Sequence, residues 1–156
     1  MDCLRVLCQD SLLAPAVKKE AVLTAFVDGA SRGNPGPASC GVVLKNPEGQ
    51  IVQTLGLTIG VTTNNVAEYT ALILAMQEAL QLGAQKLDIF TDSELVARQW
   101  SGEYKIKDST LKVLYILASH LQRCFQQVSV SHVPREQNKL ADEAANRALN
   151  QAELFK

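Results

Sequence analysis

The sequence has no excess of charge of either sign and no long hydrophobic run. Its 156 residues include 15 Lys and Arg against 16 Asp and Glu, for a formal net charge of −1. Binding of nucleic acid through a general basic field is therefore excluded, and a polyanionic partner needs local cations or a metal ion. No apolar run reaches the roughly 18–20 residues that cross a bilayer, and the N-terminus lacks an apolar block of signal-peptide length. We expect a cytoplasmic protein without a membrane partner.

The few cysteines and histidines do not form a recognisable metal motif. These residues are Cys3, Cys8, Cys40, Cys124, His120 and His132. The cysteines form no C-x-x-C pair, and neither histidine stands at zinc-finger spacing from a cysteine pair. We expect buried or free thiols. A disulfide between Cys3 and Cys8 is the alternative, which a reducing compartment disfavours.

Apolar material, in contrast, is plentiful. Hydrophobic residues make up 47% of the chain and charged residues 20%, which suffices for a core and excludes wholesale disorder. The length fits a single domain. Residues 1–20 show no clear period and are expected to form an extension, residues 21–150 the domain, and residues 151–156 a tail. Because the regular elements form a complete set after Met1, we do not expect a fragment of a larger polyprotein.

The regular part begins with β-like runs and continues with alternating helices and strands. Three runs are expected to form antiparallel strands, with a Gly- and Pro-rich loop at residues 30–37: residues 22–27, 40–45 and 51–59. One helix is predicted to begin at residues 62–65, with Gly83 as C-cap. Two more are predicted over residues 94–100 and over about 139–149, the latter with Asn138 as N-cap. Two more strands are predicted at residues 86–91 and 128–133. A further helix has an apolar face of Leu111, Leu114, Leu117, Leu121 and Phe125. This order predicts an α/β fold with a five-stranded mixed sheet and helices packed on it.

Four acidic residues stand at the ends of these elements. Asp28 and Asp92 each end a strand, while Glu68 and Asp142 fall in the first turns of two helices. Singly, each could be an ordinary turn residue or a helix-capping acid. If the four converge, their repulsion requires a divalent cation, and oxygen ligands select Mg²⁺ or Mn²⁺. A carboxylate-held metal pair is the apparatus for phosphodiester cleavage. The residue types alone leave both interpretations open.

The local sequences around these acids carry more information than their positions. Four segments occur in the order of the motifs of one family: Phe26–Ala38 (FVDGASRGNPGPA), Thr62–Tyr69 (TTNNVAEY), Thr91–Ser93 (TDS) and Pro134–Asp142 (PREQNKLAD). This ordered set, over roughly residues 21–150, resembles the type 1 ribonuclease H family. The resemblance implies a ribonuclease H-like fold.

The resemblance also implies an activity and the residues that perform it. The family hydrolyses the RNA strand of RNA–DNA hybrids with two Mg²⁺ or Mn²⁺ ions, and leaves 5′-phosphate and 3′-hydroxyl ends. By position, Asp28 would be the carboxylate shared by both ions, and Glu68 and Asp92 would hold the ion on the leaving-group side. Asp142 would hold the ion that presents the attacking water. No protein nucleophile is needed.

Contacts to the hybrid are implied for residues beside these acids. The resemblance assigns sugar and phosphate contacts to Asn34, Thr63 and Asn65, and we extend the set to Gly29, Asn64, Lys105 and Lys107. Turn formation and helix capping are alternative roles for the glycine, the threonine and the asparagines, and both roles can hold together. Recognition of the ribose 2′-hydroxyl would distinguish RNA from DNA.

Two departures from the family affect the expected function. Some members grip the hybrid with a basic helix and loop, whereas the segment Trp100–Asp108 is short and offers only Lys105 and Lys107 as cations. We therefore expect weak, salt-sensitive binding, and core packing rather than sugar stacking for Trp100. Several members carry a loop histidine that assists product release. Here the loop is shorter, and His132 falls in a strand, where we expect it to be packed and hydrogen-bonded.

In place of that histidine, our hypothesis is that Arg135 or Glu136 approaches the metal site. Two other functions remain as alternatives: a catalytically silent module that binds RNA–DNA hybrids, and another nuclease or strand-transfer enzyme of the same fold. All four acids are present, which disfavours the first, and the hybrid-contacting motifs disfavour the second. We expect the active protein to be a monomer.

Overall fold

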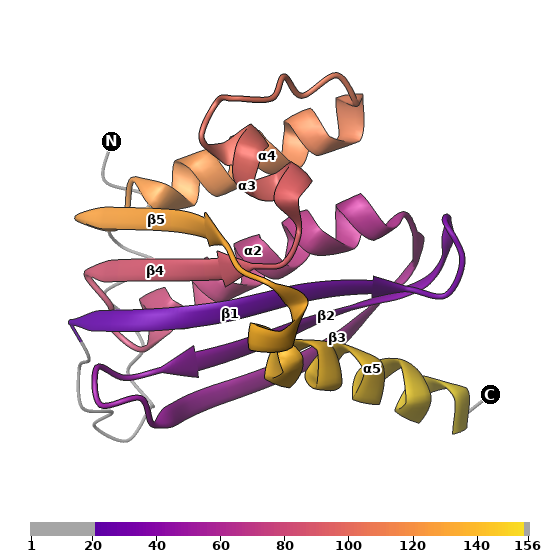
Figure 1. Ribbon diagram of the computed structural model, residues 1–156, viewed down its shortest axis with the longest axis horizontal. Coiled ribbons are helices and arrows are strands. Elements are labelled where there is room, and N and C mark those ends of the chain that lie inside the picture. The colour runs from indigo at the N-terminus through magenta and orange to yellow at the C-terminus, as the bar shows by residue number, and fades with distance from the viewer. Residues whose placement is uncertain (1–20, 155–156) are drawn as a thin grey trace.

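Five strands form one mixed sheet in the computed structural model of the chain, which describes residues 21–154 (Figure 1). The strands lie in the order β3–β2–β1–β4–β5. Their bounds are Val22–Ser31 for β1, Gly36–Lys45 for β2, Ile51–Thr62 for β3, Lys86–Thr91 for β4 and Gln127–His132 for β5. The first three strands are antiparallel, and β4 and β5 run parallel to β1. The predicted five-stranded mixed sheet is confirmed.

In the described part of the chain, four helices cover the two faces of this sheet. They are α2 (Asn64–Gln81), α3 (Glu94–Trp100), α4 (Ser109–Gln122) and α5 (Lys139–Leu154), and a short 3₁₀ turn precedes α5 at Arg135–Gln137. Successive residues of β2 show that α2 and α5 lie on opposite faces. The Cys40 thiol reaches the Ala67 carbonyl oxygen of α2, whereas Gly41 lies against the backbone of α5. Helix α2 contacts both the sheet and α4, and Figure 1 shows α2 behind the sheet with α4 beside it.

The main core lies between the sheet and α2. Alternate residues of β1 (Leu23, Ala25 and Val27) are at most 1% exposed and meet buried residues of α2 such as Leu72 and Met76. Burial of each large aliphatic side chain contributes about 1.5–3 kcal/mol. The central strand and the central helix, which carry two of the four acids, are therefore the most firmly held parts of the fold.

Helix α5 lies unusually close to the sheet because two glycines face it. A Cβ atom on Gly41 would stand 2.0 Å from the Ala141 carbonyl oxygen, and one on Gly56 would stand 2.5 Å from the Ala144 carbonyl oxygen. Real Cβ atoms do not approach so closely. Small side chains on α5, including Ala141 and Ala145, complete the contact. This contact sets the height of Asp142 above the sheet.

The first three strands are longer than the sequence pattern predicts. Parallel pairing of β1 with β4 ends at Val27–Thr91, but antiparallel pairing with β2 continues from Asp28–Gly41 to Ser31–Ala38. Asp28 therefore lies within β1 and not at its end, and the loop expected over residues 30–37 is reduced to a turn at residues 32–35. The partner strand, and not the local sequence, decides where β1 ends.

Three details of the helices also differ from the sequence-based expectation. Helix α2 begins at Asn64, which places Glu68 in its second turn. Leu117 on α4 is 50% exposed. It follows the buried Leu111 by six residues, and the resulting rotation of about 600° turns it away from the buried face. Ala118, seven residues after Leu111, returns to that face. The last helix was expected to end at residue 149, but α5 continues to Leu154. The predicted Gly83 terminus of α2 is confirmed by its positive φ of 80°.

Asn138 does not cap α5 with its side chain. Its amide nitrogen donates to the Val27 carbonyl oxygen at 2.8 Å, and its side-chain oxygen has no hydrogen-bond partner. The expected extension at residues 1–20 and a Cys3–Cys8 disulfide lie outside the described residues. Within residues 21–154, no helix combines the length and apolarity needed to cross a membrane.

Candidate active site

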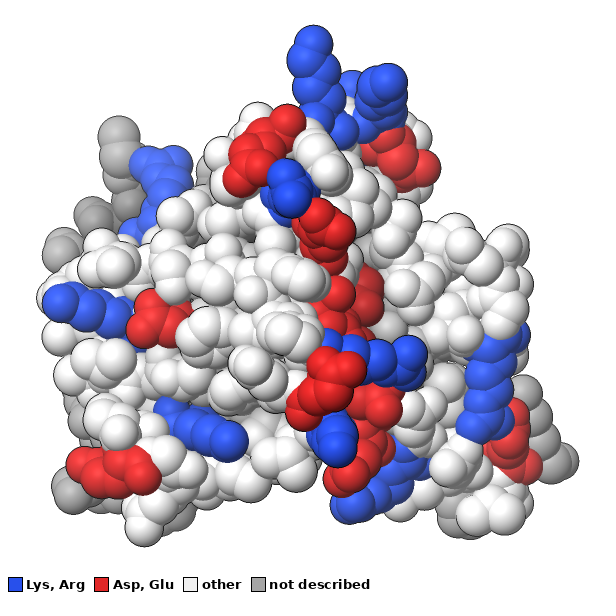
Figure 2. Space-filling model, in the orientation of Figure 1, with Lys and Arg blue, Asp and Glu red and all other residues white. Residues whose placement is uncertain are grey.

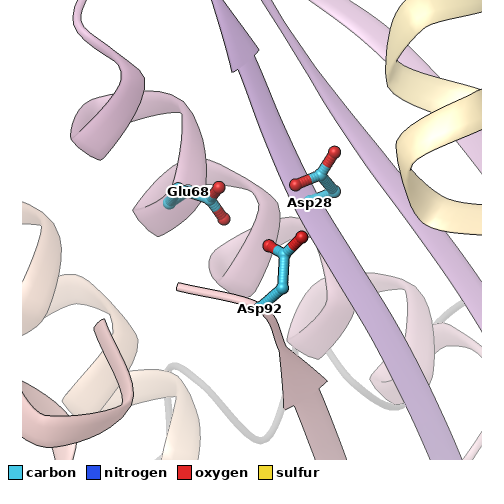
Figure 3. Close-up of side chains that lie close together, drawn as sticks. All are labelled: Asp28, Glu68 and Asp92. Carbon is cyan, nitrogen blue, oxygen red and sulfur yellow. The ribbon is translucent and has the colours of Figure 1, made fainter. Parts of the chain in front are cut away.

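Three carboxylates converge where β1 and β4 end their parallel pairing. One oxygen from each of Asp28, Glu68 and Asp92 lies within 4.8 Å of the other two, and Figure 3 shows the three side chains pointing toward one another. Asp28 and Asp92 are neighbours because each directly follows a member of the last parallel pair, Val27 and Thr91. The carboxyl ends of adjacent parallel strands are a common location for a site. The predicted convergence of these acids is present in the structure.

Glu68 is brought to the site by a close contact between α2 and β1. A Cβ atom on Gly29 would stand 2.3 Å from the Glu68 backbone nitrogen, so only glycine fits there. The Gly29 N–H also donates to the Glu68 carboxylate. Gly29 thus has a structural task that differs from the turn formation expected as its alternative role: it lies within β1, and its absent side chain makes room for α2.

Asp142, the fourth acid, approaches from the opposite face of the sheet. It lies in the first turn of α5, lines the same pocket as the other three acids, and its carboxyl is in hydrogen-bonding contact with that of Asp28. Asn138 links the two parts of the site. Its side chain holds the Val27 carbonyl oxygen, and its backbone carbonyl accepts from the Asp142 N–H at 3.1 Å.

The acids are close enough to change one another's ionisation. Burial, together with the charges of Asp92 and Asp142, raises the pKa of Asp28 from 3.8 to about 8. Burial and the charges of Asp28 and Asp92 raise the pKa of Glu68 well above its usual value. Glu68 Oε2 is also buried without a hydrogen-bond partner. A divalent cation would neutralise this charge and bind the free oxygen, so the donor set fits Mg²⁺ or Mn²⁺.

The site opens on a face where acidic residues form a band. Figure 2 shows red side chains across the middle of this face with blue side chains beside them. Near Asp142, an adjoining hollow is lined by Arg135, Glu136, Lys139 and Glu143. Arg135 Nη2 lies 3.6 Å from Asp142 Oδ1. The hypothesis from the sequence is that Arg135 or Glu136 approaches the metal site. Arg135 lines the pocket of the four acids, and Glu136 does not.

The polar residues predicted to contact the hybrid lie in the β1–β2 turn and at the start of α2, beside this pocket. Asn34 Oδ1 accepts from the Asn64 N–H at 3.2 Å, and Thr63 caps α2 by accepting from the Val66 N–H at 3.3 Å. Asn64 is exposed and lines the pocket, and Asn65 is half-buried beside it in sequence. Asn34 and Thr63 thus connect the β1–β2 turn to the start of α2.

Other predicted residues lie away from the acids. Lys105 and Lys107 are exposed between α3 and α4 and do not line the pocket of the acids. Trp100 packs against the core, with its ring 5.7 Å from that of Tyr115, which confirms core packing. The expectation of a packed His132 was wrong: this residue ends β5 and is exposed, because α3 covers only part of that edge strand.

Four residues that line the pocket were not predicted from the sequence: Ala30, Ser31, Ser93 and Asn146. Ser93 caps α3 directly after Asp92, and Asn146 lies one helical turn after Asp142. The spacing of four residues from Asp142 was the available signal for Asn146, since such pairs face each other on a helix.

The chain matches known proteins over most of its length. A family model described as reverse transcriptase-like matches residues 26–148. Ribonuclease HI of Halobacterium salinarum is 45% identical over 128 residues, which are 82% of this chain and 64% of that protein. Ribonuclease H of Chromohalobacter salexigens is 32% identical, with 86% of this chain and 88% of that protein covered. The chain spans less than two thirds of the Halobacterium protein and 35% of the mycobacterial proteins that it matches.

Solved structures give the same result. The crystal structure of ribonuclease H1 from Halobacterium salinarum has a TM-score of 0.82 and 44% identity, and the match covers 83% of this chain and 98% of that one. LC11 ribonuclease H1, solved in complex with an RNA/DNA hybrid, has a TM-score of 0.80 and 38% identity, with coverage of 83% and 98%. The sheet order, the converging acids and these matches agree, and the chain belongs to the type 1 ribonuclease H family.

Proposed function

We propose that this protein is an endonuclease that hydrolyses the RNA strand of RNA–DNA hybrids with the help of two metal ions. The observation that carries the proposal is the cluster of Asp28, Glu68 and Asp92, with a buried Glu68 oxygen that has no partner. The similarity to LC11 ribonuclease H1, which was solved with an RNA/DNA hybrid, supports the substrate class.

Each acid has a separate task in this proposal. Asp28 would be the ligand shared by both ions, Glu68 and Asp92 would hold the ion on the leaving-group side, and Asp142 would hold the other. When bound, Mg²⁺ or Mn²⁺ supplies hydroxide near neutral pH and stabilises charge on the departing oxygen. Cleavage then leaves 5′-phosphate and 3′-hydroxyl ends, and no side chain acts as nucleophile.

The hybrid is bound by the residues around the pocket. The turn that carries Asn34 and the start of α2 at Thr63, Asn64 and Asn65 contact sugars and phosphates, and the Gly29 backbone lies at the floor of the pocket. Lys105 and Lys107 contact phosphates farther along the hybrid. With few cations available, affinity is modest, and the 2′-hydroxyl of ribose provides discrimination against DNA.

The functional unit in this proposal is residues 21–150, acting as a cytoplasmic monomer. The residues after 150 also contact this unit, because Glu153, in the last turn of α5, forms an ion pair with Arg32 of the β1–β2 turn. The size of the active species can be measured by light scattering during turnover.

Cleavage of an end-labelled RNA–DNA hybrid tests the proposal, with RNA–RNA and DNA–DNA duplexes as controls, in Mg²⁺, Mn²⁺ and EDTA. We expect cleavage of the hybrid alone, only with metal, and a 3′-hydroxyl on the upstream product. Asp28→Asn should be inactive, and Glu48→Gln, which changes an exposed acid in the β2–β3 turn, should be fully active. Cleavage in EDTA would contradict the metal mechanism. Hybrid binding without cleavage would instead favour the silent binding module.

A further inference from the structure

Asp142 is less enclosed than two of the other acids. It is half-buried, as Asp92 is, whereas Asp28 and Glu68 are buried. It also stands outside the group of three carboxylates that lie within 4.8 Å of one another. A carboxylate at a helix surface can rotate about its side-chain bonds, so another group must fix its direction if it is to hold a metal ion.

Besides the Asp28 carboxyl, two side chains with nitrogen donors contact the Asp142 carboxylate, and both contact the same oxygen. Asn146 Nδ2 donates to Oδ1 at 3.1 Å, and Arg135 Nη2 lies 3.6 Å from Oδ1. Asn146 Nδ2 also donates to the Asp142 backbone carbonyl at 2.9 Å. An amide nitrogen carries two hydrogens, so one can serve each acceptor. The backbone bond fixes the amide, and the amide then fixes the carboxylate.

Of these two contacts, the one from Asn146 is the better placed to hold a direction. Arg135 is 77% exposed, and exposed ion pairs contribute little because solvent and side-chain entropy oppose them. Asn146 is half-buried, and its two bonds run along the same helix as Asp142. A neutral donor also adds no positive charge that would compete with a cation.

We propose that Asn146 is a positioning residue that holds Oδ1 of Asp142 and leaves the second carboxylate oxygen for a metal ion. The inference rests on the proposed function, because it concerns the ion assigned to Asp142. Helix stability does not explain this residue. Asparagine is a poorer helix former than alanine in a helix interior, so the position is suboptimal for α5 alone.

The test compares Asn146→Ala and Asn146→Gln with the wild type and with Gln151→Ala, which removes an exposed amide from the same helix. Mn²⁺ binding is measured by calorimetry without substrate, melting temperature in EDTA, and kcat and KM on the hybrid. For Asn146→Ala we expect an unchanged or higher melting temperature and a roughly tenfold loss of Mn²⁺ affinity at one of two sites, at the lower end of the range for residues that orient metal ligands. We expect kcat to fall about tenfold with KM within twofold of the wild type.

Asn146→Gln keeps an amide donor and should recover most of the Mn²⁺ affinity, while Gln151→Ala should match the wild type. The inference is overturned if Asn146→Ala binds Mn²⁺ and turns over as the wild type does. It is also overturned if Asn146→Ala melts at a lower temperature and Mn²⁺ affinity falls equally at both sites, which indicates general damage. A wild type that binds no Mn²⁺ and cleaves no hybrid would instead refute the proposed function, and this inference with it.

Discussion

Asp28→Asn is expected to stabilise the metal-free protein while it abolishes cleavage. Asp28 is 5% exposed and its carboxyl is in contact with those of Asp92 and Asp142, so its ionisation is opposed by burial first and by the two charges second. An asparagine side chain has nearly the same shape and no charge. It therefore keeps the packing around β1 and removes the repulsion.

The magnitude follows from the raised pKa of Asp28, which is about 8 in the folded protein against 3.8 ordinarily. A carboxyl with a raised pKa contributes its full stability below about pH 4 and loses it as the pH rises through about 8. At pH 7 the loss in free energy of unfolding reaches at most about 4 kcal/mol, since each pH unit above the ordinary pKa costs about 1.4 kcal/mol. Allowing for water that enters the pocket, we expect the Asp28→Asn substitution to stabilise the metal-free fold by about 1–4 kcal/mol, or about 3–12 °C in melting temperature.

Thermal unfolding in EDTA at pH 5, 7 and 9 measures this effect, with Glu48→Gln as the control for loss of an exposed charge. The advantage of Asp28→Asn over the wild type should grow from pH 5 to pH 9. Saturating Mg²⁺ should reverse the order, because the ion binds only the folded wild type and stabilises it by mass action. If Asp28→Asn is less stable than the wild type at every pH without metal, the charge repulsion inferred for this cluster is refuted.

Three further changes have defined outcomes. Lys105→Ala/Lys107→Ala should raise KM for the hybrid about three- to tenfold and leave kcat within twofold, because these lysines do not line the pocket of the acids; a collapse of kcat with unchanged KM would contradict this. Gly41→Ala should destabilise the fold by about 3 kcal/mol or more in urea, since the new Cβ meets the Ala141 carbonyl oxygen at 2.0 Å; an unchanged midpoint would refute the close packing of α5. Arg32→Ala removes contacts to Asn150 and Glu153 and should raise KM about twofold to fivefold with a melting temperature within about 3 °C of the wild type; a normal KM would show that the β1–β2 turn holds its position without α5.

Local pattern was sufficient wherever an element is bounded by its own residues. The bounds of β4 agree with the prediction, because an apolar alternation ends at Asp92. The start of α2 was predicted within residues 62–65, where the Thr63 hydroxyl caps the helix, and its end was predicted from Gly83. The acids were found because the sequence pattern placed each at the end of a strand or the start of a helix, although Asp28 in fact lies within β1 and Glu68 in the second turn of α2. The ordered motifs around them identified the family.

Local pattern failed where a distant part of the chain decides the outcome. β1 continues past Asp28 only because β2 pairs with it as far as Ser31. Asn138 looked like a cap, but its amide donates to Val27, 111 residues away. His132 looked like a packed strand residue, but it ends an edge strand, and the sequence does not show which strands lie at the edges of a sheet. The assignment of individual residues to metal ions and to the hybrid stays a prediction for the same reason.

The four acids differ in what holds them, and this difference determines how the site should respond to distant changes. Asp28 and Asp92 are fixed by the register of two adjacent strands, and Glu68 by the contact of α2 with Gly29. Asp142 depends instead on the height of α5 above Gly41 and on the amide of Asn146. A disturbance under α5 should therefore weaken the ion held by Asp142 and spare the ion held by Glu68 and Asp92. Loss of one ion with retention of the other is the expected signature of damage to that helix, because the strands that carry the remaining acids pack on the opposite face of the sheet against α2.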